Sequence, residues 1–266
     1  MRLTVRTGTA GWSIPSVHRD SFAEGDSMLA RYATRLDMAE INSSFYRPHQ
    51  RKTYERWAAS VPAAFRFAVK LPRAVTHEQR LRAASLPTDR FVEECTGLGE
   101  KLAVVLVQLP PSLAFDGRVA APFFAMLARS LPAGVHIACE PRHPTWAQPR
   151  AEELFERLGI NRVGADPPVI APDGAPSDYG SCRYWRLHGA PRVYYSNYGE
   201  EELSALAMRV RALAHGKPAF VVFDNTASGC ATANALAFKD MLMATPADRG
   251  AGLVGPPGLE PGTKGL

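Results

Sequence analysis

The chain has 266 residues, of which 31 are Lys or Arg and 26 are Asp or Glu, so its formal net charge is +5. Hydrophobic residues make up 46% and charged residues 21%, a globular composition that excludes a disordered chain, a collagen and a coiled coil. One α/β barrel of about 250 residues accounts for this length.

Short β-branched or apolar runs recur along the chain, and helical patterns separate most of them. Strands are predicted near 3–8, 38–42, 65–70, 103–108, 135–140, 160–166, 182–188 and 219–224. Helices are predicted near 28–36, 51–60, 88–98, 121–130, 150–158, 201–214 and 231–243. This alternation favours parallel βαβ units, and eight of them fit a closed (β/α)8 TIM-like barrel. The alternative is a doubly wound open sheet, but Gly8-Thr9-Ala10-Gly11 does not match the glycine-rich phosphate loop that such a sheet would need.

Two segments depart from the regular pattern. Between the sixth and seventh strands, PPVIAPDGAPSDYGS holds four prolines and no helical period, so a loop is predicted to replace the sixth helix. The Gly/Pro-rich end, including GPPGLEPGTKGL, is predicted to be disordered, and it also resembles a reading frame that has run on through a tRNA gene. We therefore expect one barrel domain over 1–245 and a disordered tail over 246–266.

The N-terminus, the apolar runs and the cysteines bear on location. MRLTVRTGTAGW lacks the apolar core of a signal peptide, and the apolar runs are too short to cross a bilayer. The cysteines at 95, 139, 182 and 230 stand singly, without a C-x-x-C pair. We expect a soluble cytoplasmic protein with reduced thiols and no membrane partner.

Polar residues share one parity on the predicted strands, and residues of one parity share one face of a strand. The opposite parity is mainly apolar, so we expect the polar set to point into the barrel and to converge at its C-terminal mouth, where barrel enzymes place their chemistry. The polar set consists of Glu40, Asn42, Arg66, Lys70, Gln108, His136, Glu140, Asp166, Tyr184, Arg186, His188 and Asp224.

The loops after the strands extend this candidate site. The third and fifth strands are followed by KLPRAVTHE and EPRHPTW, and the eighth by FDNTASG. These loops and the segments after the first two strands add Trp12, Tyr46, Arg73, His77, Arg142, His143, Trp146 and Asn225.

The same segments carry a family resemblance. GTAGWSIP, EINSSFYRP, FAVKLPRAVTH, QLPPS, EPRHPTW, ADPP, RLHGAPRVYYSNY and FDNTASG occur in this order from Thr7 to Leu242. They are similar to the signature blocks of the YecE-like family, a domain of unknown function. The resemblance implies a barrel fold, and it implies a distant relation to sugar isomerases, but no assigned activity.

The residues favour an enzyme that acts on a small anionic substrate, a sugar phosphate or a carboxylate, by general acid/base chemistry. Lys70, Arg73, Arg142 and Arg186 would supply positive charge. Glu140 or Asp224 would be the general base, and His188 or His143 the acid. Trp12, Tyr46 and Trp146 would wall the pocket. The catalytic candidates are Glu140, Asp224, His188 and Lys70. The candidates for binding the substrate are Trp12, Glu40, Asn42, Tyr46, Arg73, His77, Gln108, Arg142, His143, Trp146, Asp166, Arg186 and Asn225.

The charge state of Lys70 leaves two interpretations open. A buried lysine with a lowered pKa could form a Schiff base with a carbonyl substrate. The interpretation we favour from the sequence is an ion pair of Lys70 with Glu40 or Asp224.

Two other function classes stay open. No cofactor is predicted, but Glu40, Glu140, Asp166, His188 and Asp224 could bind a divalent metal in an isomerase or a phosphodiesterase. Against this, Lys70, Arg142 and Arg186 would compete for the same carboxylates. The other class is a module that binds nucleic acid or a protein, with a vestigial site, although the scattered basic residues make a small anionic molecule the favoured partner. The oligomeric state is not determined by the sequence.

Overall fold

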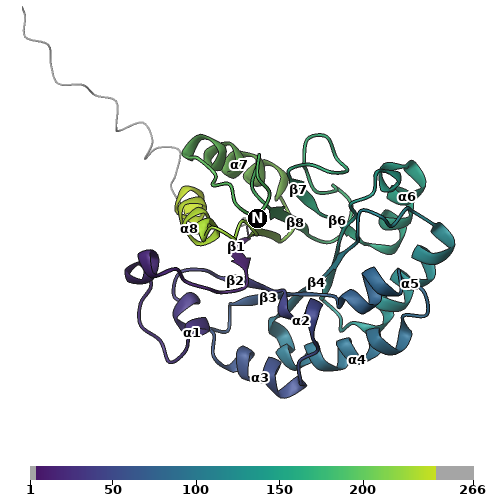
Figure 1. The fold of residues 1–266 in the computed structure, drawn as a ribbon, viewed down its shortest axis with the longest axis horizontal. Helices are drawn as coiled ribbons and strands as arrows, with labels where there is room; N and C mark the ends of the chain where they lie inside the picture. Colours follow the sequence, from purple (N-terminus) through teal and green to yellow (C-terminus); the bar gives the residue numbers. More distant parts are fainter. Residues whose placement is uncertain (1–3, 244–266) are drawn as a thin grey trace, which may run out of the picture.

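The structure is a computed structural model that describes residues 4–243, so the predicted tail lies outside the described residues. Parallel strands form a central barrel, and helices surround it (Figure 1). The strands are β1 (Val5–Ala10), β2 (Met38–Ile41), β3 (Arg66–Lys70), β4 (Leu102–Gln108), β5 (His136–Glu140), β6 (Asn161–Arg162), β7 (Gly164–Asp166), β8 (Arg183–Leu187) and β9 (Ala219–Phe223). The helices are α1 (Met28–Tyr32), α2 (Ser43–Tyr46), α3 (Arg51–Ala59), α4 (Ser85–Cys95), α5 (Gly117–Ser130), α6 (Pro149–Leu158), α7 (Glu200–Leu213) and α8 (Cys230–Met243).

The sheet order is β6-β5-β4-β3-β2-β1-β9-β8-β7, and every pair within it is parallel. β6 pairs with β5 and β7 pairs with β8, so these two short strands are halves of one interrupted strand, the sixth of the prediction. Between them, the Val163 amide donates to the Cys139 carbonyl at 2.8 Å. The predicted α/β barrel is confirmed, with its sixth strand interrupted.

The loop after β7 runs to β8 without a helix, as the prolines predicted. It packs directly on the interrupted strand at Gly164. A Cβ atom at that position would lie 2.6 Å from the Pro176 nitrogen and 2.7 Å from the Gly174 carbonyl oxygen. The side-chain-free residue therefore lets the loop cover the outside of the barrel where a helix would otherwise lie.

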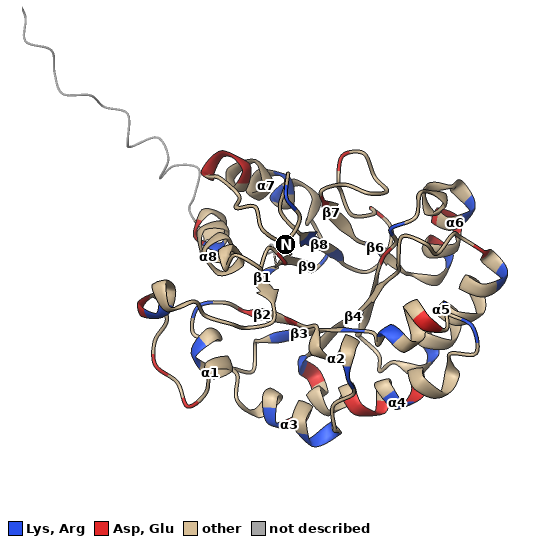
Figure 2. Ribbon diagram, viewed as in Figure 1, with Lys and Arg blue, Asp and Glu red and all other residues tan. Residues whose placement is uncertain are grey.

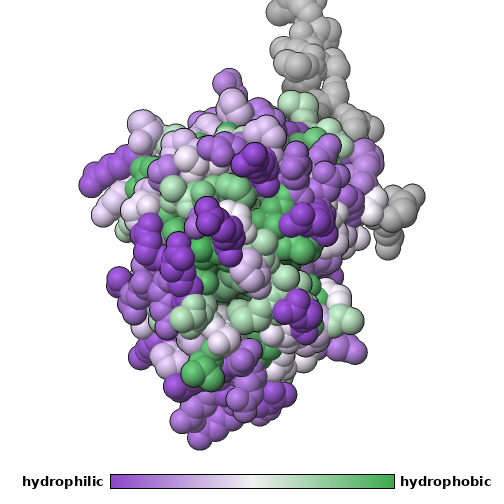
Figure 3. All heavy atoms as spheres, turned by 90° about the vertical axis from the view of Figure 1, so that its right-hand side faces the viewer, coloured by the Kyte–Doolittle hydropathy of each residue, from purple (hydrophilic) through white to green (hydrophobic). Residues whose placement is uncertain are grey.

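Two apolar layers hold the barrel. The larger lies between the strands and the helices and includes Phe67, Phe124, Phe155, Trp185 and Phe223. On the side where α5 and α6 lie, apolar residues gather at the centre of the face and hydrophilic residues surround them (Figure 3). The second layer fills the barrel interior and includes Met38, Ala68, Val104, Ala138 and Val222. Together the two layers fix the strand ends that carry the polar residues.

One predicted helix is shorter than expected. α1 was predicted over 28–36 but ends at Tyr32. The Thr34 and Arg35 amides donate to carbonyls three residues back, so the helix tightens into turns before β2. Among the described residues, no helix has the length and apolar character needed to span a membrane.

Candidate active site at the barrel mouth

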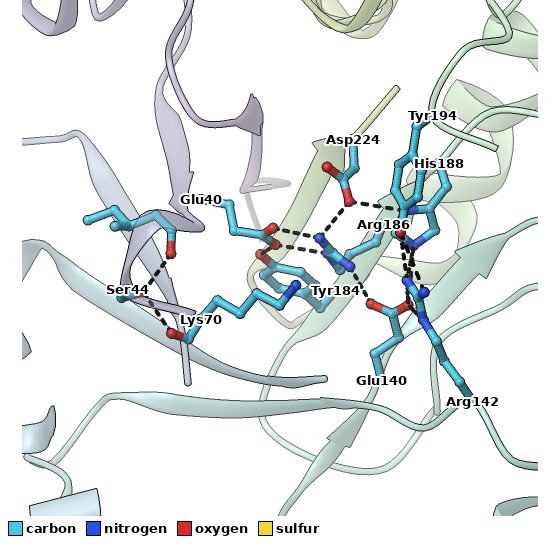
Figure 4. Close-up of polar contacts among 11 residues, drawn as sticks. Glu40, Ser44, Lys70, Glu140, Arg142, Tyr184, Arg186, His188, Tyr194 and Asp224 are labelled. Carbon is cyan, nitrogen blue, oxygen red and sulfur yellow. Dashed lines mark hydrogen bonds and ion pairs between the residues drawn. The ribbon is translucent and has the colours of Figure 1, made fainter. Parts of the chain in front are cut away.

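Charged side chains meet where the barrel strands end. Figure 2 shows acidic and basic positions on the central strands β2, β3 and β8 as well as on the outer helices. Glu40, Lys70 and Glu140 lie at or next to the last residues of β2, β3 and β5, while Arg186 and Asp224 lie at the ends of β8 and β9. All five are buried. Their side chains point toward one another inside the barrel (Figure 4).

Arg186 is the centre of this cluster. Its side chain is fully buried, and its guanidinium donates to Glu40 Oε2 at 3.0 Å and to Glu40 Oε1 at 2.8 Å. It also donates to Glu140 Oε2 at 2.5 Å and to Asp224 Oδ2 at 2.7 Å. The Tyr184 hydroxyl donates to Glu40 Oε2 at 2.7 Å. Three carboxylates thus surround one fully buried guanidinium and accept from four of its five N–H donors, so Arg186 neutralises its neighbours and is not placed to bind a substrate.

His188 links two of these carboxylates. Its Nδ1 lies 3.1 Å from Asp224 Oδ2 and its Nε2 lies 3.2 Å from Glu140 Oε1. Arg142 donates to the same Glu140 oxygen at 2.8 Å, and its Nη1 lies 3.4 Å from the Tyr194 hydroxyl. The His188 ring meets the Tyr194 ring edge-on at 5.5 Å between centroids. The imidazole is therefore held in one orientation by contacts at both nitrogens and with the Tyr194 ring.

The charges of the cluster shift the pKa values of its members. Burial would raise the pKa of Glu140, but the Arg186, His188 and Arg142 charges outweigh it and hold the pKa well below its usual range. For Asp224, Arg186 and His188 likewise outweigh burial and lower the pKa. Burial would lower the pKa of His188, but Glu140 and Asp224 raise it above 6.5. The carboxylates are therefore charged at neutral pH, and His188 is poised to be protonated.

Lys70 does not form the ion pair expected from the sequence. Its ammonium lies 4.2 Å from the centroid of the Phe45 ring, and it has no carboxylate within ion-pair distance among residues 4–243. Because Arg186 already occupies the nearby carboxylates, Lys70 is left to the aromatic ring. Burial and then Arg186 lower the pKa of Lys70 to about 8, against the opposing effect of the carboxylates. Among the described residues of the cluster, Lys70 is the cation that has no carboxylate at ion-pair distance and can meet an anionic ligand.

Helix α2 positions this lysine. The Ser44 hydroxyl, at the start of α2, donates to the Ile41 carbonyl at 3.0 Å and to the Lys70 carbonyl at 2.7 Å. The next residue, Phe45, thereby brings its ring beneath the ammonium, and it also contacts His77 edge-on at 5.0 Å. Burial and then Lys70 lower the pKa of His77, consistent with a place beside the amine.

Several other predicted residues do not join the hydrogen bonds of the cluster. Gln108 ends β4 beside Glu140 in register. Asn42 follows β2, and its Oδ1 is buried without a hydrogen-bond partner in the described part of the chain. Tyr46 is 73% exposed. Arg73 is also exposed, and it pairs with Glu78 at 3.1 Å.

Asn225 lies directly after Asp224 and is fully buried. Its Nδ2 donates to the Ser196 carbonyl at 2.9 Å and to Asn234 Oδ1 at 2.8 Å. These bonds tie the loop after β8 to α8, so the side chain supports the mouth of the barrel.

Asp166 does not point into the barrel. It stands in register with Leu187, which faces the helices, while Ala165 stands beside Arg186. The Asp166 carboxylate accepts a hydrogen bond from the Tyr198 hydroxyl at 2.5 Å, outside the strands. The predicted inward parity is therefore wrong for the interrupted strand, where Val163 belongs to the interior apolar layer instead.

Three aromatic residues predicted for the mouth have other surroundings. Trp146 is buried, stacks on Phe155 at 5.5 Å and donates from Nε1 to the Leu113 carbonyl at 2.9 Å. His143 accepts from the Thr145 amide at 3.2 Å and so caps the short turn Pro144–Ala147. Trp12 packs edge-on against Trp57 on α3 at 5.2 Å. The structure therefore does not bring these three side chains into the charged cluster.

Tyr184 was predicted to point into the barrel but was not named as a catalytic or substrate-binding candidate, and Tyr194 was not predicted at all. Tyr184 shares the parity of Arg186, so the strand pattern contained the signal for it. Tyr194 belongs to the long loop after β8, and it reaches Arg142 and His188 only because that loop folds back, with the Tyr194 amide donating to the His188 carbonyl at 2.6 Å. No local pattern in the sequence indicates this return.

Comparisons with known proteins support the family resemblance that the sequence motifs indicate. A family model described as Protein of unknown function DUF72 matches residues 6–255. Escherichia coli (strain K12) UPF0759 protein YecE is 24% identical over 163 residues, which are 61% of this chain and 57% of that protein, so the match spans little more than half of this relative.

Solved structures extend the likeness to nearly the whole chain. A DUF72 family protein from Thermotoga maritima has 26% identity and a TM-score of 0.75, covering 91% of this chain and 100% of its own. A sugar phosphate isomerase/epimerase from Parabacteroides distasonis has 13% identity and a TM-score of 0.52, covering 92% and 96%, and it shows a shared fold alone. By its ordered motifs, its barrel and the match over residues 6–255, the chain belongs to the DUF72 family.

Proposed function

We propose that this protein is an enzyme that binds a small anionic substrate, a sugar phosphate or a carboxylate, at Lys70 and transfers protons through Asp224 and His188. The observation that carries the proposal is the buried Lys70 ammonium, which lies in a cluster of charges but has no anionic partner at ion-pair distance within residues 4–243. A buried cation without a partner is costly, and an anionic ligand would remove that cost.

Asp224 and His188 have the arrangement that proton transfer requires. Asp224 Oδ2 contacts both Arg186 and His188, whereas no hydrogen bond occupies Oδ1 among the described residues, and the side chain is 11% exposed. Glu40 and Glu140, by contrast, use both oxygens in the cluster. We therefore assign the general base to Asp224, with Glu140 as a positioning residue. Because both His188 nitrogens face carboxylates, His188 exchanges its proton with the substrate through Asp224.

The donor set does not fit a divalent metal. The three carboxylates of Glu40, Glu140 and Asp224 already surround the Arg186 guanidinium, which occupies the position of the cation. Asp166, a further expected ligand, lies outside the barrel with Tyr198. Within residues 4–243, no group of His, Cys, Asp and Glu side chains is arranged to hold a metal ion.

A screen of sugar phosphates and small hydroxy- and keto-carboxylates, followed by NMR detection of products and of deuterium exchange from solvent, tests the proposal. We expect at least one compound to turn over or to exchange a carbon-bound proton. An absence of both with every compound, including at high enzyme concentration, would contradict the proposed function.

Lys70→Met is expected to raise KM for the substrate by about 10- to 100-fold, because a charge-assisted contact is lost, while kcat changes less. Arg118→Gln removes a positive charge from the exposed surface of α5 and serves as the matched control, with unchanged KM. A fall in kcat at unchanged KM would refute the binding role of Lys70.

The pH profile gives a second test of Lys70. Its pKa of about 8 predicts that the ammonium loses its charge as the pH rises through that value. We therefore expect kcat/KM to fall above pH 8 through a rise in KM, and the step to disappear in Lys70→Met. If the wild-type KM stays constant between pH 7 and pH 9, Lys70 does not bind the anionic group.

A further inference from the structure

The opposite, N-terminal end of the barrel opens into a cavity of about 590 Å³. Arg6, Arg66 and His136 line it from the starts of β1, β3 and β5, and Phe220 from β9 lies among them. In register, Arg6 stands beside Phe220, which belongs to the interior apolar layer, so this arginine enters the barrel opening from inside. Arg66 and His136 belong to the polar set that was predicted to point into the barrel. They lie at its N-terminal end, so they take no part in the proposed chemistry at the mouth.

In the part of the chain that the structure describes, the two arginines have no anionic partner at ion-pair distance. Arg6 Nη2 lies 3.4 Å from the Ala64 carbonyl, and its buried Nε has no hydrogen-bond partner among the same residues. Arg66 donates from Nη1 to the Ala63 and Phe65 carbonyls at 2.7 and 2.9 Å. Neither guanidinium forms an ion pair within the described residues. Both thus keep donor groups for a ligand.

The surrounding charges favour an anion. Burial and then the Arg66 guanidinium lower the pKa of Arg6, so the two cations repel each other. The Asp37 carboxylate acts in the opposite direction and raises the pKa of Arg6. It is already engaged, because it accepts from the Thr7 amide at 2.7 Å and pairs with Lys239 at 3.1 Å. Glu100, the acidic residue that lines the cavity, is exposed.

We propose that this cavity binds a phosphate monoester, with the phosphate between Arg6 and Arg66 and the organic part against Phe220 and Pro218. Guanidinium groups match phosphate oxygens with two parallel hydrogen bonds. The cavity has the volume of a small-molecule site, in the range of about 300–1,000 Å³, so it takes more than an inorganic ion. The apolar interior layer of Met38, Ala68, Val104, Ala138 and Val222 separates it from the cluster at the mouth.

Titration calorimetry with phenyl phosphate and with inorganic phosphate tests this site on the full chain. We expect the Arg6→Gln/Arg66→Gln double variant to bind phenyl phosphate at least about tenfold more weakly than the wild type. Arg118→Gln/Arg157→Gln removes the same charge from exposed positions of α5 and α6 and should bind like the wild type. In Lys70→Met, the binding that the Arg6/Arg66 double variant loses should persist, which separates this site from any binding at the mouth.

Four results would overturn the inference: equal binding by the wild type and the Arg6/Arg66 double variant, loss of binding in Lys70→Met alone, phenyl phosphate no tighter than inorganic phosphate, or no wild-type binding below about 10 mM. If the double variant does not fold, NMR of the wild type decides. Phenyl phosphate should then shift the His136 ring signals in the wild type and in Lys70→Met, and unshifted His136 signals would refute the site.

Discussion

Replacing Arg186 with methionine is expected to lower the free energy of unfolding by about 3–5 kcal/mol, because it leaves three buried carboxylates without their shared cation. Glu40, Glu140 and Asp224 all contact this guanidinium. Urea denaturation monitored by circular dichroism measures the loss. Arg142→Met is the matched control. Among the carboxylates of the described residues, Arg142 pairs with Glu140 alone, and its side chain is 20% exposed, so we expect a smaller loss.

The pH dependence of that loss is a further part of the same prediction. In the wild type, Glu140 and Asp224 have lowered pKa values, so their contribution to stability is present above the unfolded pKa and is lost as pH falls. Without Arg186, burial raises these pKa values, and protonation then stabilises the folded variant. The stability deficit should therefore narrow between pH 7 and pH 5. A deficit that is constant or that widens would show that the carboxylates do not depend on Arg186 for their charge.

Asp224→Asn is expected to lower kcat by about 10²- to 10⁴-fold for the substrate that the screen identifies, because the amide cannot accept a proton. The variant should fold, since Arg186 keeps its contacts with Glu40 and Glu140. Asp173→Asn removes a carboxylate from an exposed loop position outside the cluster and should leave kcat unchanged.

An NMR titration of His188 distinguishes the role of Asp224 as the general base from a merely structural role. Asp224 Oδ2 lies 3.1 Å from His188 Nδ1, so replacing the Asp224 carboxylate should lower the pKa of His188 toward its ordinary value. Normal turnover by Asp224→Asn would exclude Asp224 as the base. A low kcat with an unchanged His188 pKa would contradict the coupling between the two residues.

Periodicity carried most of the fold prediction because strands and helices are local structures. The predicted strands agree with those observed, apart from small shifts at their ends and the interruption of the sixth. Inward parity was right for Glu40, Lys70, Glu140, Arg186 and Asp224, because alternate residues of a regular barrel strand face the interior. It was wrong for Asp166, since β7 is short and its register with β8 is set by pairing across the sheet.

The sequence by itself determined the barrel, its loop in place of the sixth helix and the strand ends that carry charge, because alternation and turn residues act over a few positions. Only the tertiary structure decided which charges neutralise each other. Arg186 takes the three carboxylates, Lys70 is left beside Phe45, and Trp146 turns away into the core. These pairings join residues far apart in the chain, and their geometry exists only once the barrel has closed.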